Sequence, residues 1–329
     1  MVEVGGCQSY IDHVTSGFPQ GSIIGPLLYV LTVGVAFKEH EDAALARADE
    51  IGQKMRLYHY ADDVKIMYSF ENVDEMDNVQ ELVKKLEVEG KKLGLKFNPL
   101  KSCLMKFGTG HYTESINLNE QTIPEVGSFR DLGCIISKTY TFVLNMESQM
   151  MKAKWVINIG KYSLKIRDET SMKMVYQMYF QSVLLYCSEV WYNTEDATNK
   201  KLRNIDEKFW RLLLNNMTRP ECHNSVQICV KKSLMFYFKI THGIQVVDLY
   251  KGFENSPSNH ETRAKVKGDL RLPLVKSAML RNEYVAVTTK LYNKLPENAR
   301  NSRLLCVYER AVNAFIEEEY NDARLQLLG

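Results

Sequence analysis

Hydrophobic and polar positions in the first third of the chain alternate between helical and strand spacing. Apolar residues dominate 23–37, with Ser22 just before them and Pro26 near their start, which predicts a buried helix capped by Ser22. Two short β-prone runs, 56–60 and 64–68, are separated by only three residues. Such spacing predicts two antiparallel strands joined by a tight hairpin turn.

Helical periodicity returns after this hairpin. Apolar residues recur at helical spacing from Val79 to Leu93, and Gly94 follows them as a left-handed stop. Asn72 and Glu75 resemble a capping box ahead of this helix. Further strands are expected at 95–97, 102–107 and 129–136.

From about residue 145 onward the pattern is predominantly helical, with long apolar and aromatic faces. Three such faces follow one another along the chain. The first is preceded by a helix cap at Asp168 or Thr170, and the third lies within 226–250. Aromatic stripes at this spacing are typical of a buried core. The first two faces are Met172, Val175, Tyr176, Tyr179, Val183 and Tyr186, and Leu202, Ile205, Phe209, Leu212 and Leu213. The pattern as a whole predicts an α+β fold.

Composition narrows the class without identifying it. The 329 residues carry 42 Lys and Arg against 40 Asp and Glu, with 45% hydrophobic residues, which is typical of a folded chain and excludes wholesale disorder. The seven cysteines form no Cys-x-x-Cys motif, which argues against a zinc knuckle or a disulfide framework. The beginning of the chain lacks the pattern of a secretory signal, and the apolar run 23–37 is too short to span a membrane.

Two adjacent carboxylates are expected at the tip of the predicted hairpin. Asp62 and Asp63 follow Tyr60 and Ala61, between an apolar run on each side. Asp favours turns for purely structural reasons, and an Asp pair is common by chance. A rigid hairpin nevertheless projects both carboxylates, and their oxygens are the hard ligands that Mg²⁺ prefers in two-metal phosphoryl transfer.

A glycine-rich run precedes the first predicted helix. It reads Gly17-Phe18-Pro19-Gln20-Gly21-Ser22-Ile23-Ile24-Gly25-Pro26-Leu27-Leu28. Glycines every four residues let the backbone approach a ligand closely, and Pro19 fixes the loop. A glycine-rich turn alone can simply mark the start of a helix. Its occurrence together with the Tyr-Ala-Asp-Asp run, in this order and at this distance, is very unlikely by chance.

Together these two motifs resemble the reverse transcriptase of non-LTR, LINE-type retrotransposons. The resemblance implies that Pro19, Gln20 and Gly21 abut template and nucleotide, together with Tyr60 and Ala61. It makes Asp62 the expected principal ligand of Mg²⁺ or Mn²⁺ and Asp63 a secondary one. Within the run Gly94-Leu95-Lys96-Phe97-Asn98-Pro99-Leu100-Lys101-Ser102, it places Lys101 near the triphosphate; the alternative is an ordinary surface lysine.

Later motifs extend the resemblance over most of the chain. The run 129–136 looks like the turn that grips the primer end, with Leu132 and Gly133 at its centre. The run Leu184-Leu185-Tyr186-Cys187-Ser188-Glu189-Val190-Trp191 resembles the helical thumb of these elements. The expected domains are a partial palm at 1–140, a helical thumb at 141–250 and a basic tail at 251–329.

The sequence also departs from the family pattern. The family places a further metal-binding aspartate well upstream of the Pro-Gln-Gly loop, but only sixteen residues precede Gly17, and Asp12 is the sole Asp among them. Gly34 and Val35 stand where the family usually continues to an Asn-Asp pair. We therefore interpret the sequence as that of an N-terminally truncated enzyme, and we expect this chain alone not to polymerise DNA.

Several alternatives stay open at this point. The expected partners are an RNA template, a DNA primer and dNTP, with no membrane, inside the cell in nucleus or cytoplasm; the sequence leaves the oligomeric state undefined. A non-catalytic nucleic-acid-binding remnant is the main alternative, and a group II intron maturase a third. Between Arg263 and Arg310, eleven basic residues face four acidic ones, which suits phosphate contact or simply a solvated face.

Overall fold

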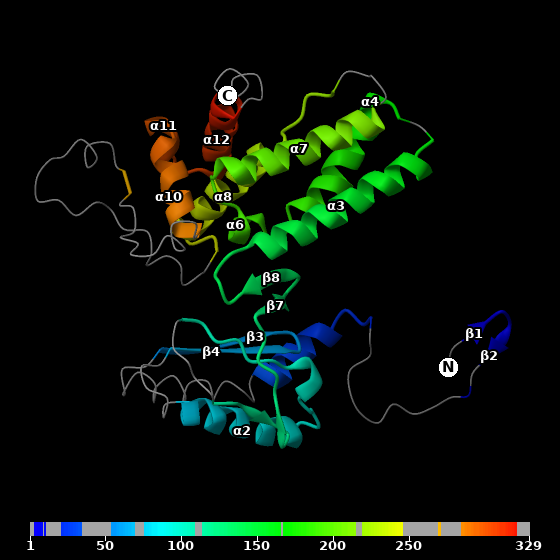
Figure 1. Cartoon of the computed structure of the whole chain (residues 1–329), viewed down its shortest axis with the longest axis vertical. Helices are drawn as coiled ribbons and strands as arrows, with labels where there is room; N and C mark the ends of the chain where they lie inside the picture. The colour runs from blue at the N-terminus through cyan, green and yellow to red at the C-terminus, as the bar shows by residue number, and fades with distance from the viewer. Residues whose placement is uncertain are drawn as a thin grey trace, which may run out of the picture. The chain divides into compact units, whose positions relative to one another are not determined.

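The computed structural model describes 3–8, 10, 21–34, 54–69, 76–108, 114–165, 167–214, 219–245, 269–270 and 284–320. The chain divides into two compact units, Met1–Gly127 and Ser128–Gly329. Helices and two-stranded antiparallel sheets make up the described residues (Figure 1), which confirms the expectation of a mixed α and β architecture at this level.

In unit 1 (Met1–Gly127), the predicted hairpin is present. Strand β3 (Lys54–Tyr60) pairs antiparallel with β4 (Asp63–Ser69), from Lys54 opposite Ser69 to Tyr60 opposite Asp63. Met55 and Leu57 are buried, whereas Arg56 and Tyr58 between and after them are exposed. This period of two is the reason that the run forms a half-buried strand. A further small hairpin pairs β1 (Glu3–Val4) with β2 (Cys7–Gln8).

Helix α2 (Met76–Lys92) carries two buried stripes. Leu82 and Leu86 pack with the β3–β4 hairpin, while Met76 and Val83 pack with Ile116 and other apolar residues near the small hairpin of β5 (Asn117–Leu118) and β6 (Gln121–Thr122). The helix ends as the sequence predicts, because Gly94 has a φ of 71°. The capping box expected at Asn72 and Glu75 lies outside the described residues.

Two predicted strands of unit 1 do not form. Residues 95–98 carry no strand pairing, and within 102–107 only Leu104 makes a single bridge, to Glu125. Leu95 and Phe97 instead pack their side chains against the core while their backbone passes into η2 (Pro99–Lys101). Packing of the apolar side chains against the core is enough to explain their alternation. Without a neighbouring strand to pair with, the segment does not form a strand.

In unit 2 (Ser128–Gly329), one short hairpin leads into a helical bundle. Strands β7 (Ser128–Asp131) and β8 (Cys134–Ser137) confirm the strand prediction for 129–136. The bundle consists of α3 (Val143–Ser163), α4 (Glu169–Val175), α5 (Ser182–Leu184), α6 (Ser188–Trp191), α7 (Asp196–Leu213), α8 (Ser225–Thr241), α10 (Tyr284–Lys294), α11 (Glu297–Arg300) and α12 (Leu305–Glu319) (Figure 1).

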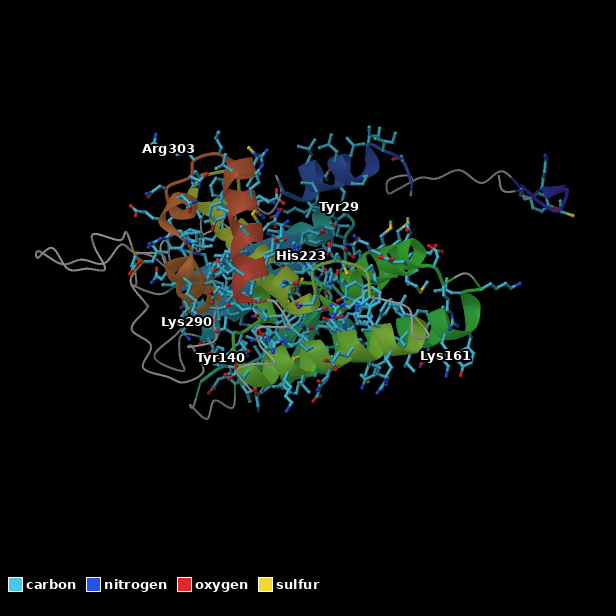
Figure 2. The ribbon with its side chains drawn as sticks, turned by 90° about the horizontal axis from the view of Figure 1, so that it is seen from above. Tyr29, Tyr140, Lys161, His223, Lys290 and Arg303 are labelled. Carbon is cyan, nitrogen blue, oxygen red and sulfur yellow. The ribbon has the colours of Figure 1, made fainter. Side chains whose placement is uncertain are left out.

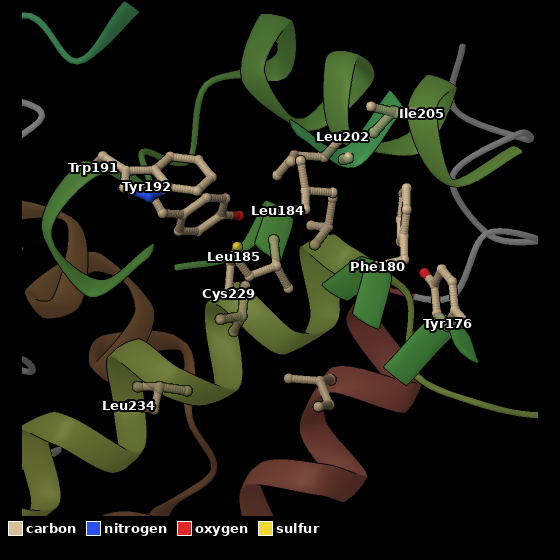
Figure 3. Close-up of a cluster of buried hydrophobic side chains, with 14 of the residues drawn as sticks. Tyr176, Phe180, Leu184, Leu185, Trp191, Tyr192, Leu202, Ile205, Cys229 and Leu234 are labelled. Atoms are coloured by element: carbon tan, nitrogen blue, oxygen red, sulfur yellow. The ribbon is translucent and has the colours of Figure 1, made fainter. Parts of the chain in front are cut away.

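The aromatic core of unit 2 follows a different register from the predicted one. The π-helical segment η3 (Tyr176–Gln181) follows α4, and its longer i to i+5 hydrogen-bonding repeat rotates the buried face. Phe180 is therefore fully buried, whereas Tyr179, predicted as core, is 63% exposed. Figure 3 shows this core, in which Tyr176 and Phe180 stack with their ring centroids 5.3 Å apart. Four of the five residues of the second predicted face, Leu202, Ile205, Phe209 and Leu213 of α7, are buried, and Leu212 is partly buried against the same core.

A buried carboxylate joins α7 to α8. The backbone N–H of Ser225 donates to Asp206 Oδ2 at 2.8 Å, and the Ser225 hydroxyl donates to Asp206 Oδ1 at 2.6 Å. Asn224 and Gln227 complete a capping box at the same helix start. Burial raises the pKa of Asp206 to about 6, although the hydrogen bonds from Ser225 favour its charged form.

Candidate active site

The two predicted metal-ligating aspartates lie at the tip of the β3–β4 hairpin. Asp62 is in the two-residue turn after Ala61, and Asp63 begins β4 opposite Tyr60. Ala61 has a φ of 51°, a left-handed value that suits a tight hairpin turn. Both aspartates and Tyr60 are exposed, so the turn offers two neighbouring carboxylates to solvent rather than to the core.

The helix over 25–34 lies close to this turn. The Ser22 hydroxyl oxygen accepts a hydrogen bond from the Gly25 N–H at 2.9 Å, as the predicted cap requires. Val33 is buried in the cluster of the β3–β4 hairpin, and Tyr29 packs against that cluster. Burial raises the pKa of the Tyr29 phenol (Tyr29 is labelled in Figure 2), and the charge of Asp62 raises it further.

The rest of this helix presents apolar side chains to solvent. Ile23 is 98% exposed, and the exposed large apolar residues around it are Ile24, Leu27, Leu28, Val30 and Leu31. A contiguous apolar face of this kind is typical of a surface that meets another structural element.

The predicted nucleotide-binding loop is described only in part. Gly21 is exposed and has a φ of 83°, a conformation that glycine adopts without strain. Pro19 and Gln20 lie outside the described residues. The structure therefore brings together Tyr60, Ala61, Asp62 and Asp63 in one turn, with the helix that begins after Gly21 beside it.

Lys101 occupies a separate element. It is the last residue of η2, where the Asn98 side chain accepts a hydrogen bond from the Leu100 N–H. Its side chain is exposed. The contacts in the described structure do not link Lys101 to the aspartates, so its role at the triphosphate stays a prediction.

The donor set at the hairpin tip fits a divalent cation in part. Two adjacent carboxylates supply hard oxygen ligands, which Mg²⁺ and Mn²⁺ prefer. Among the described residues, no group of three or more His, Cys, Asp or Glu side chains lies close enough together to hold a metal ion. A complete two-metal site would need a further carboxylate beside Asp62 and Asp63.

The predicted primer-grip residues form the turn of the β7–β8 hairpin. Leu132 and Gly133 have φ values of 46° and 87°, and Asp131 pairs with Cys134 on either side of them. Positive φ at both central residues defines a type I′ turn, which favours glycine in the second position. The Tyr186 hydroxyl donates to the Leu132 carbonyl oxygen at 2.7 Å.

The described part of the basic C-terminal segment is only partly available for phosphate contact. Arg300 pairs with Asp269, and only 8% of the Arg300 side chain is exposed. Exposed basic residues lie on α10, before α12 and on α12, with Lys290 and Arg303 labelled in Figure 2: Lys290, Lys294, Arg303 and Arg310.

The sequence analysis gave no role at these hairpins to three residues that the structure places there. Tyr29 packs against the cluster of the β3–β4 hairpin, while Tyr186 and Asn145 contact the β7–β8 hairpin. Tyr186 was predicted as core, which is wrong, because it is 45% exposed. The signal for Tyr186 was present, because a tyrosine hydroxyl in the apolar run 183–186 needs a hydrogen-bond partner. The other two depend on tertiary packing.

Comparisons with known proteins show which sequences this chain is similar to. Residues 3–141 match the family model described as reverse transcriptase (RNA-dependent DNA polymerase). The curated relatives include a probable RNA-directed DNA polymerase from transposon BS of Drosophila melanogaster, 28% identical over 65% of this chain and 24% of the relative. The RNA-directed DNA polymerase from mobile element jockey of Drosophila funebris is 22% identical over 64% of this chain and 23% of the relative.

These matches confirm the resemblance drawn from the sequence. The match over residues 3–141 and the similarity to RNA-directed DNA polymerases of mobile elements support a reverse transcriptase of the LINE type. The chain spans about a quarter of the length of the curated relatives that it matches. No solved structure matches the chain. None of the described helices combines the length and the apolar character needed to cross a bilayer.

Proposed function

We propose that this chain supplies part of the palm of an RNA-directed DNA polymerase that uses two metal ions for phosphoryl transfer. The observation that carries the proposal is the exposed carboxylate pair at the tip of a hairpin that packs against the helix following the glycine-rich loop, through Val33 and Tyr29. An RNA template, a DNA primer and dNTP are the proposed substrates, and the proposed setting is the nucleus or cytoplasm.

The residues of the hairpin have distinct proposed roles. Asp62 would be the principal ligand of Mg²⁺ or Mn²⁺, and Asp63 the secondary one. When bound, such ions activate the attacking primer hydroxyl and stabilise the leaving phosphate. Tyr60 and Ala61 would contact nucleotide or template beside them.

The loop and η2 have proposed roles in holding the nucleotide. Pro19, Gln20 and Gly21 would let the backbone approach the incoming nucleotide closely. Lys101 would contact its triphosphate or donate a proton to the leaving group. Its exposed position leaves the side chain available for either role.

The larger regions follow the same proposal. We assign 1–140 to the palm, 141–250 to the thumb and 251–329 to a basic tail. The compact units divide at Gly127 and Ser128, so the β7–β8 hairpin belongs to the compact unit that holds the helical bundle.

We also propose that this chain alone does not polymerise DNA, because two carboxylates at one turn do not complete a two-metal site. Primer extension by the full chain with Mg²⁺ or Mn²⁺ tests this directly. Template-dependent synthesis that disappears in Asp62→Asn would establish the polymerase and overturn the proposed inactivity.

Metal binding can be tested without activity. Fe²⁺ in place of Mg²⁺, with added hydrogen peroxide as oxidant and ascorbate to regenerate Fe²⁺, produces hydroxyl radicals that cleave the backbone near a bound ion. We expect cleavage near residue 62 and in the glycine-rich loop, and its loss in Asp62→Asn/Asp63→Asn. Cleavage that is unchanged in this variant would contradict the proposed ligands.

A non-catalytic nucleic-acid-binding protein is the second candidate. It is favoured by the exposed basic residues of α10 and α12 and by α3, where Lys161 lies over the ring of the exposed Tyr162 and Trp155 is also exposed. Stacking on aromatic rings and phosphate contact by lysine are the usual means of holding single strands. Affinity for RNA that falls steeply with salt, without cleavage by Fe²⁺ at the hairpin, would favour this candidate.

A further inference from the structure

The β7–β8 turn contains a residue in an unfavourable backbone conformation. Leu132 lies at a φ of 46°, a value that costs a residue with a side chain about 1 kcal/mol or more relative to ordinary backbone. Leu132 is also exposed, so burial of its own side chain does not fix the turn. The surrounding contacts must therefore hold it.

Tyr186 contacts both central residues of the turn. Its hydroxyl donates to the Leu132 carbonyl oxygen at 2.7 Å. Its ring lies so close to Gly133 that a Cβ atom there would be 3.0 Å from the nearest ring carbon. On the next residue pair, the Ile135 N–H donates to Asn145 Oδ1 at 2.9 Å. The turn is thus clamped by the Tyr186 side chain and tied to α3 beside it.

Tyr186 is itself fixed by two helices. The Trp191 indole N–H of α6 donates to the Tyr186 carbonyl oxygen at 2.7 Å. The Lys232 ammonium of α8 donates to the Leu185 carbonyl oxygen at 3.0 Å. These bonds hold the two carbonyls where the chain turns between α5 and α6, with Cys187 at a φ of 53°; the Leu185 carbonyl also accepts a hydrogen bond from the Ser188 N–H. The Tyr186 ring therefore has a defined position set by the bundle.

We propose that Tyr186 is a positioning residue that holds the Leu132–Gly133 turn in the conformation that engages the primer 3′ end. The inference rests on the proposed function of that turn. It adds a residue of the helical bundle that determines whether the turn can act, through one hydrogen bond and one ring contact.

The experiment compares Tyr186→Phe with Tyr179→Phe in the full chain. Tyr186→Phe deletes only the hydroxyl that reaches Leu132, and Tyr179→Phe deletes an exposed hydroxyl in the same stretch of chain. The probes are a labelled RNA template–DNA primer with a recessed 3′ end and a blunt duplex of the same length, bound without dNTP. Hydrogen exchange is followed in parallel over 128–137.

We expect the wild-type chain and Tyr179→Phe to prefer the recessed end. Tyr186→Phe should lose about fivefold of that preference, the factor that one hydrogen bond of ordinary net strength is worth. Exchange over 128–137 should become faster in Tyr186→Phe alone. Thermal unfolding should stay close to wild type in both variants, which separates positioning from a general loss of stability.

The outcomes separate this inference from the function on which it rests. If wild type prefers the recessed end and Tyr186→Phe keeps the preference, or exchange is unchanged, the positioning role is wrong while the primer-grip assignment stands. If wild type binds both probes equally, the primer-grip assignment is wrong and the inference falls with it. Should Tyr186→Phe not fold, Gly133→Ala disturbs the same contact from the turn, and unchanged preference there would equally overturn the proposal.

Discussion

The two compact units of the chain differ in how much core supports their turns. Unit 1 holds its hairpin with two small apolar clusters, and much of the helix over 25–34 remains exposed. Unit 2 has one large cluster built around Tyr176, Phe180 and Phe209. The candidate metal-binding carboxylates thus lie on the lightly packed unit, whereas the turn held by Tyr186 lies on the densely packed one.

The largest expected effect tests the register of the dense core. Phe180→Ala should lower the free energy of unfolding of unit 2 by about 4 kcal/mol, because it opens a cavity beneath a fully buried ring. Tyr179→Ala, one residue away and exposed, should cost less than about 1 kcal/mol. Urea denaturation followed by tryptophan fluorescence measures both, since Trp155, Trp191 and Trp210 all lie in unit 2. A larger cost for Tyr179→Ala than for Phe180→Ala would show that the α-helical register predicted from the sequence is correct.

The buried carboxylate of unit 2 predicts a pH dependence of the stability of that unit. The folded pKa of Asp206 is raised from 3.8 to about 6, so the folded state binds the proton more tightly than the unfolded state. Stability is therefore greatest below about pH 4 for this group and falls by about 3 kcal/mol as pH rises to about 6. Denaturation midpoints between these values measure it. Asp206→Asn should remove this dependence, and a variant with the wild-type slope would contradict the assignment.

Unit 1, which has a small core, is expected to unfold independently of unit 2. Leu86→Ala should destabilise unit 1 by about 2 kcal/mol, the low end for such a change, because its neighbours Tyr29, Val64 and Ile66 are only partly buried and can relax. Hydrogen exchange over 54–69 should become faster, while the tryptophan fluorescence transition stays where it is. A matching shift of that transition would show that the units unfold together.

The smallest effect concerns a helix start in unit 2. Asn224→Ala should cost about 1 kcal/mol, since it removes the acceptor for the Gln227 N–H in the capping box of α8. Asp206 still accepts from Ser225, so the helix should keep its length. Thermal denaturation measures the loss, and far-ultraviolet circular dichroism reports whether α8 shortens.

The sequence predicted local structure well where one signal decides it. The β3–β4 hairpin follows from alternation plus a short turn, and the end of α2 follows from Gly94. The strands expected at 95–97 and 102–107 were wrong, because alternation alone does not supply a pairing partner. Tyr179 was misplaced because a π-helical turn leaves no simple trace in apolar spacing.

The candidate site was predictable to a similar extent. Asp62 and Asp63 could be placed at a turn from neighbouring residues, and the structure agrees. The contact of Tyr186 with Leu132 spans 54 residues and depends on how α5, α6 and α8 pack, which no local pattern encodes. The catalytic and nucleotide-binding roles remain predictions for the experiments above.

Ala61 gives the carboxylate turn a property that glycine would not. A methyl group at a φ of 51° costs about 1 kcal/mol or more relative to ordinary backbone, so the pairing of Tyr60 with Asp63 has to hold the turn in this shape. The conformation of this turn therefore depends on the strand pairing beside it and not on Ala61 alone. Asp62 and Asp63 would therefore present their carboxylates to an ion from a turn whose backbone the two strands hold.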